Sequence, residues 1–277
     1  MSPETKSKAQ RRAEAQRRAA EQRAAASRKK RTRLGLQIGA VVVLVVAVIV
    51  VIVVVSGGGG GTPAVFKNPH VSGLEPIPSS MKASWKQPPT GKPGPEVIPL
   101  VNAPKLASLD NAATGQTING VQCQAGEKTV SHVHTHLTIF VNGQARQIPY
   151  GIGIPGFQAY QINPGSPAGP GPFVETGTCF YWLHVHTNDG IIHIESPSKT
   201  MGFTLGQFFD EWGIPLSSTQ VGSATGKVTV FFTSPGKSAQ LFTGDPRTLP
   251  LGDHYQIQLV VGTPIVAPFH VTNWGGL

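Results

Sequence analysis

The sequence predicts an α+β fold, in which a small mixed β-sheet of hairpins packs against one helix and a single transmembrane helix precedes the domain. Two hairpin-turn dipeptides, Asn142-Gly143 and Asp189-Gly190, lie next to segments in which polar and apolar residues alternate. A short segment, 204–212, has its apolar residues at helical spacing. A charge-free apolar segment, 34–55, precedes all of these elements.

The first 33 residues form a basic tail that carries the whole net charge of the protein. Twelve lysines and arginines stand against three glutamates there, which gives the +9 of the complete chain. The remaining residues are electrically balanced, so the basic composition indicates nothing about the partners of the folded domain. We expect no nucleic-acid ligand, because only this tail favours one and the segment that follows explains the tail more simply.

Residues 34–55 are expected to form a membrane-spanning helix. These 22 residues contain no charge and span about 33 Å at 1.5 Å per residue, enough for the hydrocarbon core. The alternative is a cleaved signal peptide, whose apolar region is normally about 7–15 residues long, but no A-x-A-like cleavage site is present. The basic residues 28–33 predict a cytoplasmic N-terminus. We therefore expect a single-pass protein of the plasma membrane, anchored in the lipid bilayer, with an extracytoplasmic chain after residue 56.

A flexible linker is predicted between the membrane and the folded domain. Residues 56–117 include five consecutive glycines, are rich in proline, glycine and serine, and have weak hydrophobic periodicity. We expect an extended spacer with some local packing on the domain. The folded domain is then predicted to cover residues 118–277, a length that supports one hydrophobic core.

The two cysteines, Cys123 and Cys179, are the only ones in the chain. Outside the membrane an isolated pair predicts a disulfide. The alternative is that Cys179 ligates a metal. Alternation along a strand disfavours this alternative, because Cys179 shares its side with the apolar Leu183 and Val185 and not with His184.

Histidines occupy every second position at the start of one predicted strand. His132, His134 and His136 therefore share one face, while most of the apolar residues around them point to the other. The dipeptide Asn142-Gly143 ends this strand with a predicted two-residue hairpin turn.

A second hairpin is predicted around Asp189-Gly190. A two-residue turn at this dipeptide pairs His186 with His193 and His184 with Glu195. All four side chains then lie on one face, with directly opposed Cβ atoms about 4.5–5.5 Å apart, so that two of them can bind one ion. The candidate metal ligands of both hairpins are His132, His134, His136, His184, His186, His193 and Glu195. Whether the two hairpins form one site or a pair of sites stays open at this stage.

One helix is predicted between Thr204 and Gly213. The sequence Thr204-Leu-Gly-Gln207 has the form of a capping box, and apolar residues recur through Trp212 with the spacing of a helix that packs on a sheet. Strands are expected at 227–233 and 255–261. A helix that crosses between two pairs of strands suggests a β-grasp-like arrangement by analogy.

At these motifs the chain resembles a family of membrane-anchored or secreted histidine-rich domains of actinobacteria and archaea that has no established activity. The family pattern combines an HxHxHL strand, a YWLHxH hairpin that ends in GIIHxESP, and an FTLGQFF helix. Here these motifs read as residues 132–137, 181–197 and 203–209, and the likeness covers about residues 130–260. Members usually have His-Thr-His-Asp where residues 184–187 are His-Val-His-Thr, a departure that leaves the ligand positions intact. The resemblance implies a shared domain and no particular chemistry.

The pattern favours a tethered extracytoplasmic metal-binding domain. Imidazole nitrogens with one carboxylate suit Zn²⁺ or Cu²⁺, the expected cofactors, and also Fe²⁺ or Ni²⁺, but disfavour Ca²⁺ and Mg²⁺. A second hypothesis is a metal-dependent hydrolase or oxidase, in which an open position takes water or oxygen and Glu195 or Asp189 acts as the base. A third is a pH-responsive scaffold whose histidines become charged below about pH 6.5. The sequence leaves enzyme activity, the metal, the substrate and any protein partner open.

Overall fold

The structure is a computed structural model that describes residues 66–89, 103–162, 171–271, 274 and 277. These residues belong to one compact unit, which covers residues 65–277. The predicted basic tail, transmembrane helix and glycine tether, residues 1–61, lie outside the described residues. None of the described helices has the length and apolar character needed to cross a membrane.

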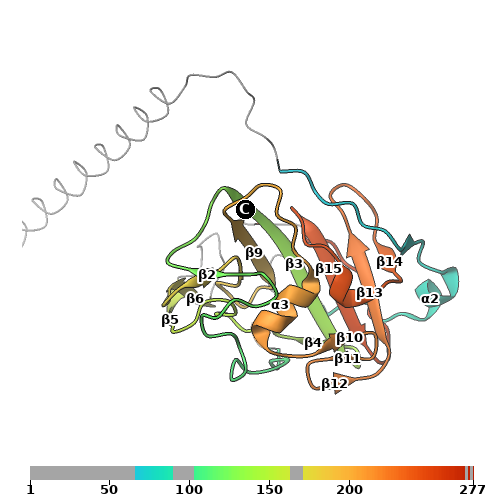
Figure 1. Ribbon diagram of the computed structural model, residues 1–277. Coiled ribbons are helices and arrows are strands. Elements are labelled where there is room, and N and C mark those ends of the chain that lie inside the picture. Colours follow the sequence, from blue (N-terminus) through green and yellow to red (C-terminus); the bar gives the residue numbers. More distant parts are fainter. Residues whose placement is uncertain (1–65, 90–102, 163–170, 272–273, 275–276) are drawn as a thin grey trace, which may run out of the picture. The chain divides into compact units, whose positions relative to one another are not determined.

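The centre of the fold is an eight-stranded mixed sheet with the order β1-β14-β13-β15-β3-β9-β8, in which β4 also pairs with β3 (Figure 1). Its strands are β1 (Leu74–Glu75), β3 (Ser131–Val141), β4 (Gln144–Arg146), β8 (Leu183–His184), β9 (Ile191–Ser196), β13 (Val228–Thr233), β14 (Gln240–Phe242) and β15 (Tyr255–Val261). Neighbouring strands run antiparallel except β15 and β3, which run parallel at the middle of the sheet. The predicted α+β class is confirmed.

Three smaller sheets surround the central one. Their strands are β2 (Cys123–Gln124) with β7 (Phe180–Tyr181), β5 (Gln158–Ile162) with β6 (Gly171–Thr176), and β10 (Leu216–Ser217), β11 (Gln220–Val221) and β12 (Ala224–Thr225). The predicted disulfide is confirmed, since Cys123 and Cys179 are bonded next to the β2–β7 pair with their Cα atoms 5.5 Å apart.

The predicted helix is α3 (Leu205–Trp212), and its capping box is present. The Thr204 side chain accepts a hydrogen bond from the backbone N–H of Gln207, whose side chain accepts one from the backbone N–H of Thr204. Gly213 ends the helix in the left-handed conformation at φ 73°, a position that favours glycine. Two short helices complete the described set, α2 (Ser79–Ser84) and the 3₁₀ turn η1 (Pro246–Thr248).

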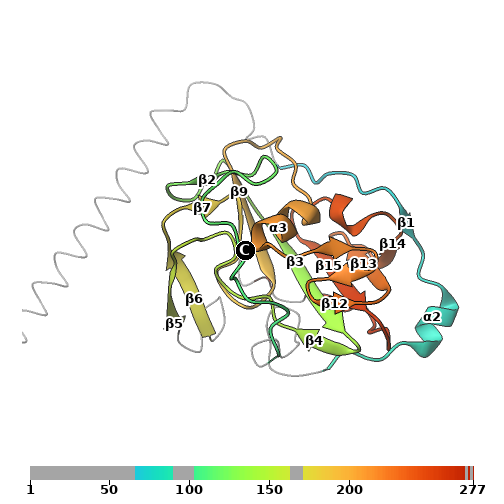
Figure 2. The same ribbon diagram turned by 60° about the horizontal axis from the view of Figure 1, so that its bottom comes forward.

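Strand β3 separates two different environments. On one side, Val133, Leu137 and Ile139 join the main hydrophobic core with the α3 residues Phe208 and Trp212. Figures 1 and 2 show α3 lying across this part of the sheet. The side chains of alternate residues point the other way, where one end of β3 carries histidines and the other end carries a smaller apolar cluster. That cluster consists of Phe140, Phe231, Val260 and Val266.

Parts of the predicted spacer 56–117 pack onto the domain. Strand β1 pairs with β14, Lys86 forms a bridge with Val266, and Val71 and Leu106 are buried in the main core. The compact part of the chain thus begins before the expected boundary at residue 118.

The structure confirms the predicted strand register at one of the two hairpins and not at the other. At Asn142-Gly143 the prediction is confirmed, because Val141 pairs directly with Gln144 and both turn residues have positive φ, 51° and 75°. At Asp189-Gly190 the predicted register is wrong by two residues.

In the second hairpin the structure pairs His184 with His193, where the sequence predicted His186 with His193 and His184 with Glu195. The backbone groups needed for a tight turn bond elsewhere. Val185 N–H donates to Ile152 O, and His186 O accepts from Val174 N–H. A shift of two residues keeps every side chain on its predicted face, so His184, His186, His193 and Glu195 still point to one side.

Candidate metal centre

The two histidine motifs meet in a row that crosses three adjacent strands. On β3, His134 lies opposite His193 of β9, and His193 lies opposite His184 of β8. In the next row His132 lies opposite Glu195. Because neighbouring strands are about 4.8 Å apart, the side chains of both motifs converge on one face of the sheet. The structure therefore brings the two motifs together in one continuous cluster.

One group of the cluster is buried and combines His184, His186, His193 and Glu195, whose potential ligand atoms all lie within 4.8 Å of one another. His184 Nδ1 lies 2.8 Å from the carbonyl oxygen of Tyr181, and His186 Nδ1 hydrogen-bonds the carbonyl oxygen of Val174. A carbonyl oxygen only accepts, so each Nδ1 must carry the proton. In an uncharged imidazole the other nitrogen, Nε2, then presents a lone pair.

These two lone pairs face each other. His184 Nε2 and His186 Nε2 are 3.1 Å apart, and both nitrogens are acceptors in this tautomer. The contact is unfavourable unless a cation or a proton lies between them. The backbone carbonyls that fix the two tautomers are the kind of outer partner that metal-binding histidines usually have.

A second group consists of His132, His134 and His193, and its potential ligand atoms also lie within 4.8 Å of one another. His134 Nε2 lies 3.1 Å from His132 Nε2 and 3.2 Å from His193 Nδ1. The side chain of His132 is 42% exposed, so this group is open to solvent where the first group is buried.

Two carboxylates contact the imidazoles. Glu195 Oε1 lies 3.0 Å from His132 Nε2, 3.8 Å from His193 Nδ1 and 3.9 Å from His184 Nε2. Its other oxygen, Oε2, is buried without a hydrogen-bond partner among the described residues. Burial, assisted by the nearby Glu127, raises the pKa of Glu195 to about 7.

Glu127 is a site residue that the sequence analysis missed. It lies in the loop before β3, and its Oε1 is 3.5 Å from His186 Nε2. Nothing in the local pattern identifies it, because the contact depends on how the β2–β3 loop is placed against the segment that follows β8.

Burial favours the uncharged form of three imidazoles of the cluster, those of His134, His184 and His193. Burial, followed by the charges of neighbouring histidines, lowers the pKa of His134 and of His184 to about 3. The same causes lower the pKa of His193 well below its ordinary value. Uncharged imidazole is the form that binds a metal ion, so these side chains need lose no proton to do so at neutral pH.

Aromatic side chains pack against the histidines of the buried group. The Phe173 ring of β6 stacks on His186 at 5.1 Å between centroids, and the Phe180 ring meets the edge of His184 at 5.6 Å. The β5–β6 hairpin is tied to the same place, because Val174 N–H donates to His186 O. This apolar cover excludes water from the His184 and His186 rings and fixes their orientation.

His136 is not part of either group, although the sequence analysis included it among the ligands. Its Nε2 lies 3.0 Å from the carbonyl oxygen of Asp189, and its Nδ1 lies 3.3 Å from Thr138 Oγ1. Both ring nitrogens thus have protein partners. Asp189 accepts a hydrogen bond from Ile191 N–H at 3.0 Å, as expected of a turn residue.

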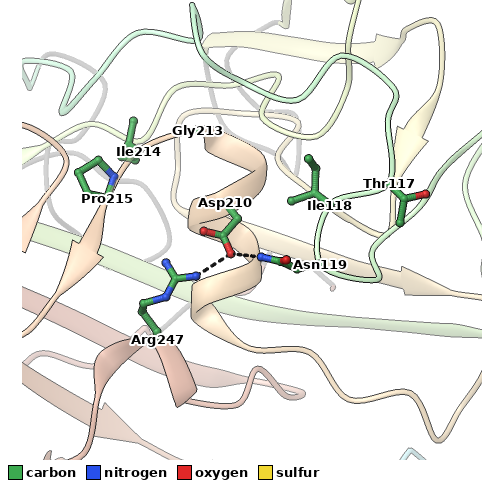
Figure 3. Close-up of a pocket in the computed structure, with 8 residues that line it drawn as sticks. All are labelled: Thr117, Ile118, Asn119, Asp210, Gly213, Ile214, Pro215 and Arg247. Carbon is green, nitrogen blue, oxygen red and sulfur yellow. Dashed lines mark hydrogen bonds and ion pairs between the residues drawn. The ribbon is translucent and has the colours of Figure 1, made fainter.

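A hollow of about 540 Å³ lies elsewhere on the surface, beside the end of α3 (Figure 3). Its charged side chains are Asp210 and Arg247, which form an ion pair at 2.6 Å, and Asp210 also accepts a hydrogen bond from Asn119. None of the eight residues drawn there belongs to the histidine cluster.

Comparisons of the chain with protein-family models, with curated proteins and with solved structures give no match.

Proposed function

We propose that this chain is a metal-binding protein whose buried group, His184, His186, His193 and Glu195, holds a divalent transition-metal ion. The observation that carries the proposal is the 3.1 Å approach of two Nε2 atoms whose tautomers are set by backbone carbonyls. A metal ion between these lone pairs turns an unfavourable contact into two coordinate bonds.

The donor set supports zinc or copper as the ion. Zinc–nitrogen bonds of about 2.0–2.1 Å in a tetrahedron place two ligand atoms about 3.3 Å apart, close to the observed 3.1 Å. Glu195 Oε1, at 3.9 Å from His184 Nε2, has to move by less than about 1 Å to complete such a site. Three imidazoles and one carboxylate do not suit Ca²⁺ or Mg²⁺.

We also propose that the domain is extracytoplasmic and that residues 34–55 anchor it in the plasma membrane. The support is the charge-free apolar segment after a basic tail and the disulfide between Cys123 and Cys179, since disulfides persist in oxidising compartments.

We further propose that the central strands form a β-grasp-like core, which the strand order β9-β3-β15-β13 supports. Its first and last strands in the chain, β3 and β15, are parallel neighbours, and α3 connects the two pairs.

The test is the metal content of the full-length chain. The protein is produced in an oxidising compartment with an affinity tag that lacks histidine, purified in detergent, and analysed by mass spectrometry after exposure to Zn²⁺ or Cu²⁺. We expect wild type to retain metal and the double variant His184→Gln/His186→Gln to lose the ion of the buried group. Formation of the Cys123–Cys179 disulfide and an unchanged circular dichroism spectrum verify that the variant is folded.

The matched control is His70→Gln/His270→Gln, which removes two exposed histidines outside the cluster and should leave the metal content unchanged. Wild-type protein that binds no Zn²⁺ or Cu²⁺ at micromolar concentration contradicts the proposal. The Co²⁺-loaded protein separates a binding site from an enzyme, because an exchangeable water ligand indicates a position for a substrate.

A further inference from the structure

We infer that the cluster binds two metal ions, with a second ion at His132, His134 and His193. His193 would bind one ion through each ring nitrogen, as an imidazolate whose ring proton is released to solvent. This inference rests on the proposed function, since it adds an ion to the one held by the buried group.

The cluster offers more donors than one ion uses. Its six side chains exceed the four ligands of a tetrahedral site. The potential ligand atoms fall into two separate groups, each within 4.8 Å, and not into one group of six. His193 is the residue that belongs to both groups.

The strand order explains why His193 is shared. Strand β9 lies between β3 and β8, and the row His134–His193–His184 crosses all three strands. With about 4.8 Å between neighbours, the outer two backbones are about 9.6 Å apart. His134 and His184 therefore approach His193 from opposite sides, each with a further histidine two residues away on its own strand or segment, His132 and His186.

The second group has the donors that an ion requires. His134 Nε2 faces two other ring nitrogens at 3.1 and 3.2 Å, which is again close to the separation of ligands around one ion. A second ion between these nitrogens would take the place of the imidazole–imidazole hydrogen bonds. Two carboxylates, Glu195 and Glu127, lie against the cluster and offset part of the added positive charge.

The ligands of the two ions differ in their exposure to solvent, and this difference sets the order in which a chelator removes the ions. His132 is 42% exposed, whereas the side chain of His184 is fully buried. A chelator reaches the second ion first, because one of its three ligands borders solvent. We expect the second ion to be removed at a chelator concentration at least tenfold lower than the first.

The experiment is a copper titration of the full-length chain, followed by electron paramagnetic resonance. We expect wild type to bind two equivalents of Cu²⁺, with a signal per copper less than half that of isolated Cu²⁺, because two ions on either side of His193 couple magnetically. His132→Gln/His134→Gln should bind one equivalent with the full signal. The single variant His132→Gln, at an exposed position, tests the same point without risk to folding and should weaken only the second equivalent.

The outcomes separate this inference from the proposed function. A single equivalent that His132→Gln/His134→Gln leaves unchanged, or two equivalents with the full signal of isolated ions, overturns the two-ion centre and leaves the buried site intact. Failure to bind any metal removes the proposed function itself, and the two-ion centre with it.

Discussion

Two turns of similar sequence form different hairpins in this protein. At Asn142-Gly143 the strands pair up to the turn, with Val141 opposite Gln144. At Asp189-Gly190 the ladder between β8 and β9 ends at the pair His184–His193, and residues 185–190 are in neither strand.

The difference comes from the contacts that each turn makes with the rest of the chain. Asn142-Gly143 has its φ values set by the turn itself, and pairing continues directly into β4. In the second loop, Gly190 O accepts from Leu137 N–H of β3, and Val185 O accepts from Gly151 N–H. At the first turn Asn142 N–H also donates to Val261 O of β15, but this bond leaves the pairing with β4 in place. In the second loop, which is built into a site, tertiary hydrogen bonds decide the register.

Acidification should have the largest effect, and it should act on the histidine cluster and not on the Asn142-Gly143 turn, which has no titratable group. The pKa of His134 and of His184 is lowered to about 3 in the folded protein, so below pH 6.5 the unfolded chain binds more protons and stability falls as the pH falls. Each of these histidines should lose about 2 kcal/mol of stability between pH 6.5 and pH 5. Denaturant titration of metal-free protein should therefore give a pH dependence that is smaller by about 2 kcal/mol in His184→Gln.

Two carboxyl groups work in the opposite direction, because burial raises the pKa of Glu195 and of Glu211. The comparison between variant and wild type isolates the histidine contribution from theirs. Gly143→Ala is the control, since it changes a turn, residues 141–144, that contains no titratable group, and it should keep the wild-type pH dependence. An equal pH dependence in wild type and His184→Gln contradicts the burial of an uncharged histidine.

An alanine at each turn glycine should give the next largest effect. Gly190 has φ 81°, and an added Cβ would clash with the carbonyl oxygen of Leu137, a backbone atom. Left-handed strain of about 1–2 kcal/mol and a disturbed hydrogen bond of about 1 kcal/mol predict a loss of about 3 kcal/mol for Gly190→Ala. The measurement is the free energy of unfolding of the metal-free protein in urea.

Gly143→Ala is the matched substitution in the other hairpin. Its φ is 75°, but the added Cβ meets side-chain atoms of Pro264, the nearest at 2.8 Å. A side chain adjusts more easily than a backbone, so we expect only about 1.5 kcal/mol, mostly from the strained φ. Equal losses at the two glycines contradict the view that the backbone contact at Gly190 costs more than the side-chain contact at Gly143.

Asp189→Ala should have the smallest effect. It removes one hydrogen bond, from Ile191 N–H to the Asp189 side chain, worth about 1 kcal/mol. Metal content should stay at the wild-type level, because the carboxylate is not one of the ligands. A loss of bound metal comparable to that of His184→Gln/His186→Gln would instead assign Asp189 to the centre.

Local patterns predicted much of this fold and the faces of its side chains. The capping box at Thr204, the turn at Asn142-Gly143 and the disulfide depend on neighbouring residues or on a single pair. Four of the predicted ligands, His184, His186, His193 and Glu195, stay together despite the wrong register. Strand alternation has a period of two, so a slip of two residues leaves every side chain on the same face.

Features that depend on distant contacts were not predictable from the pattern. The sequence does not state that β9 pairs with β3, which brings His134 beside His193. It gives no sign that the carbonyl oxygen of Asp189 contacts His136, or that Glu127 reaches His186. The segment before residue 118 reads as a spacer because it is rich in proline and glycine, yet its few apolar residues, such as Val71 and Leu106, fill the core.

The parallel pairing of β3 with β15 has a consequence for how the chain is made. Tyr255 pairs with Thr135, and Val261 pairs with Val141, so one neighbour of β3 is synthesised long after all the histidines of the cluster. Until then one side of β3 presents unpaired backbone N–H and C=O groups along a strand rich in β-branched and aromatic residues, which invites pairing with other chains. Chains that end before residue 255 should therefore aggregate, even though every metal ligand is already present.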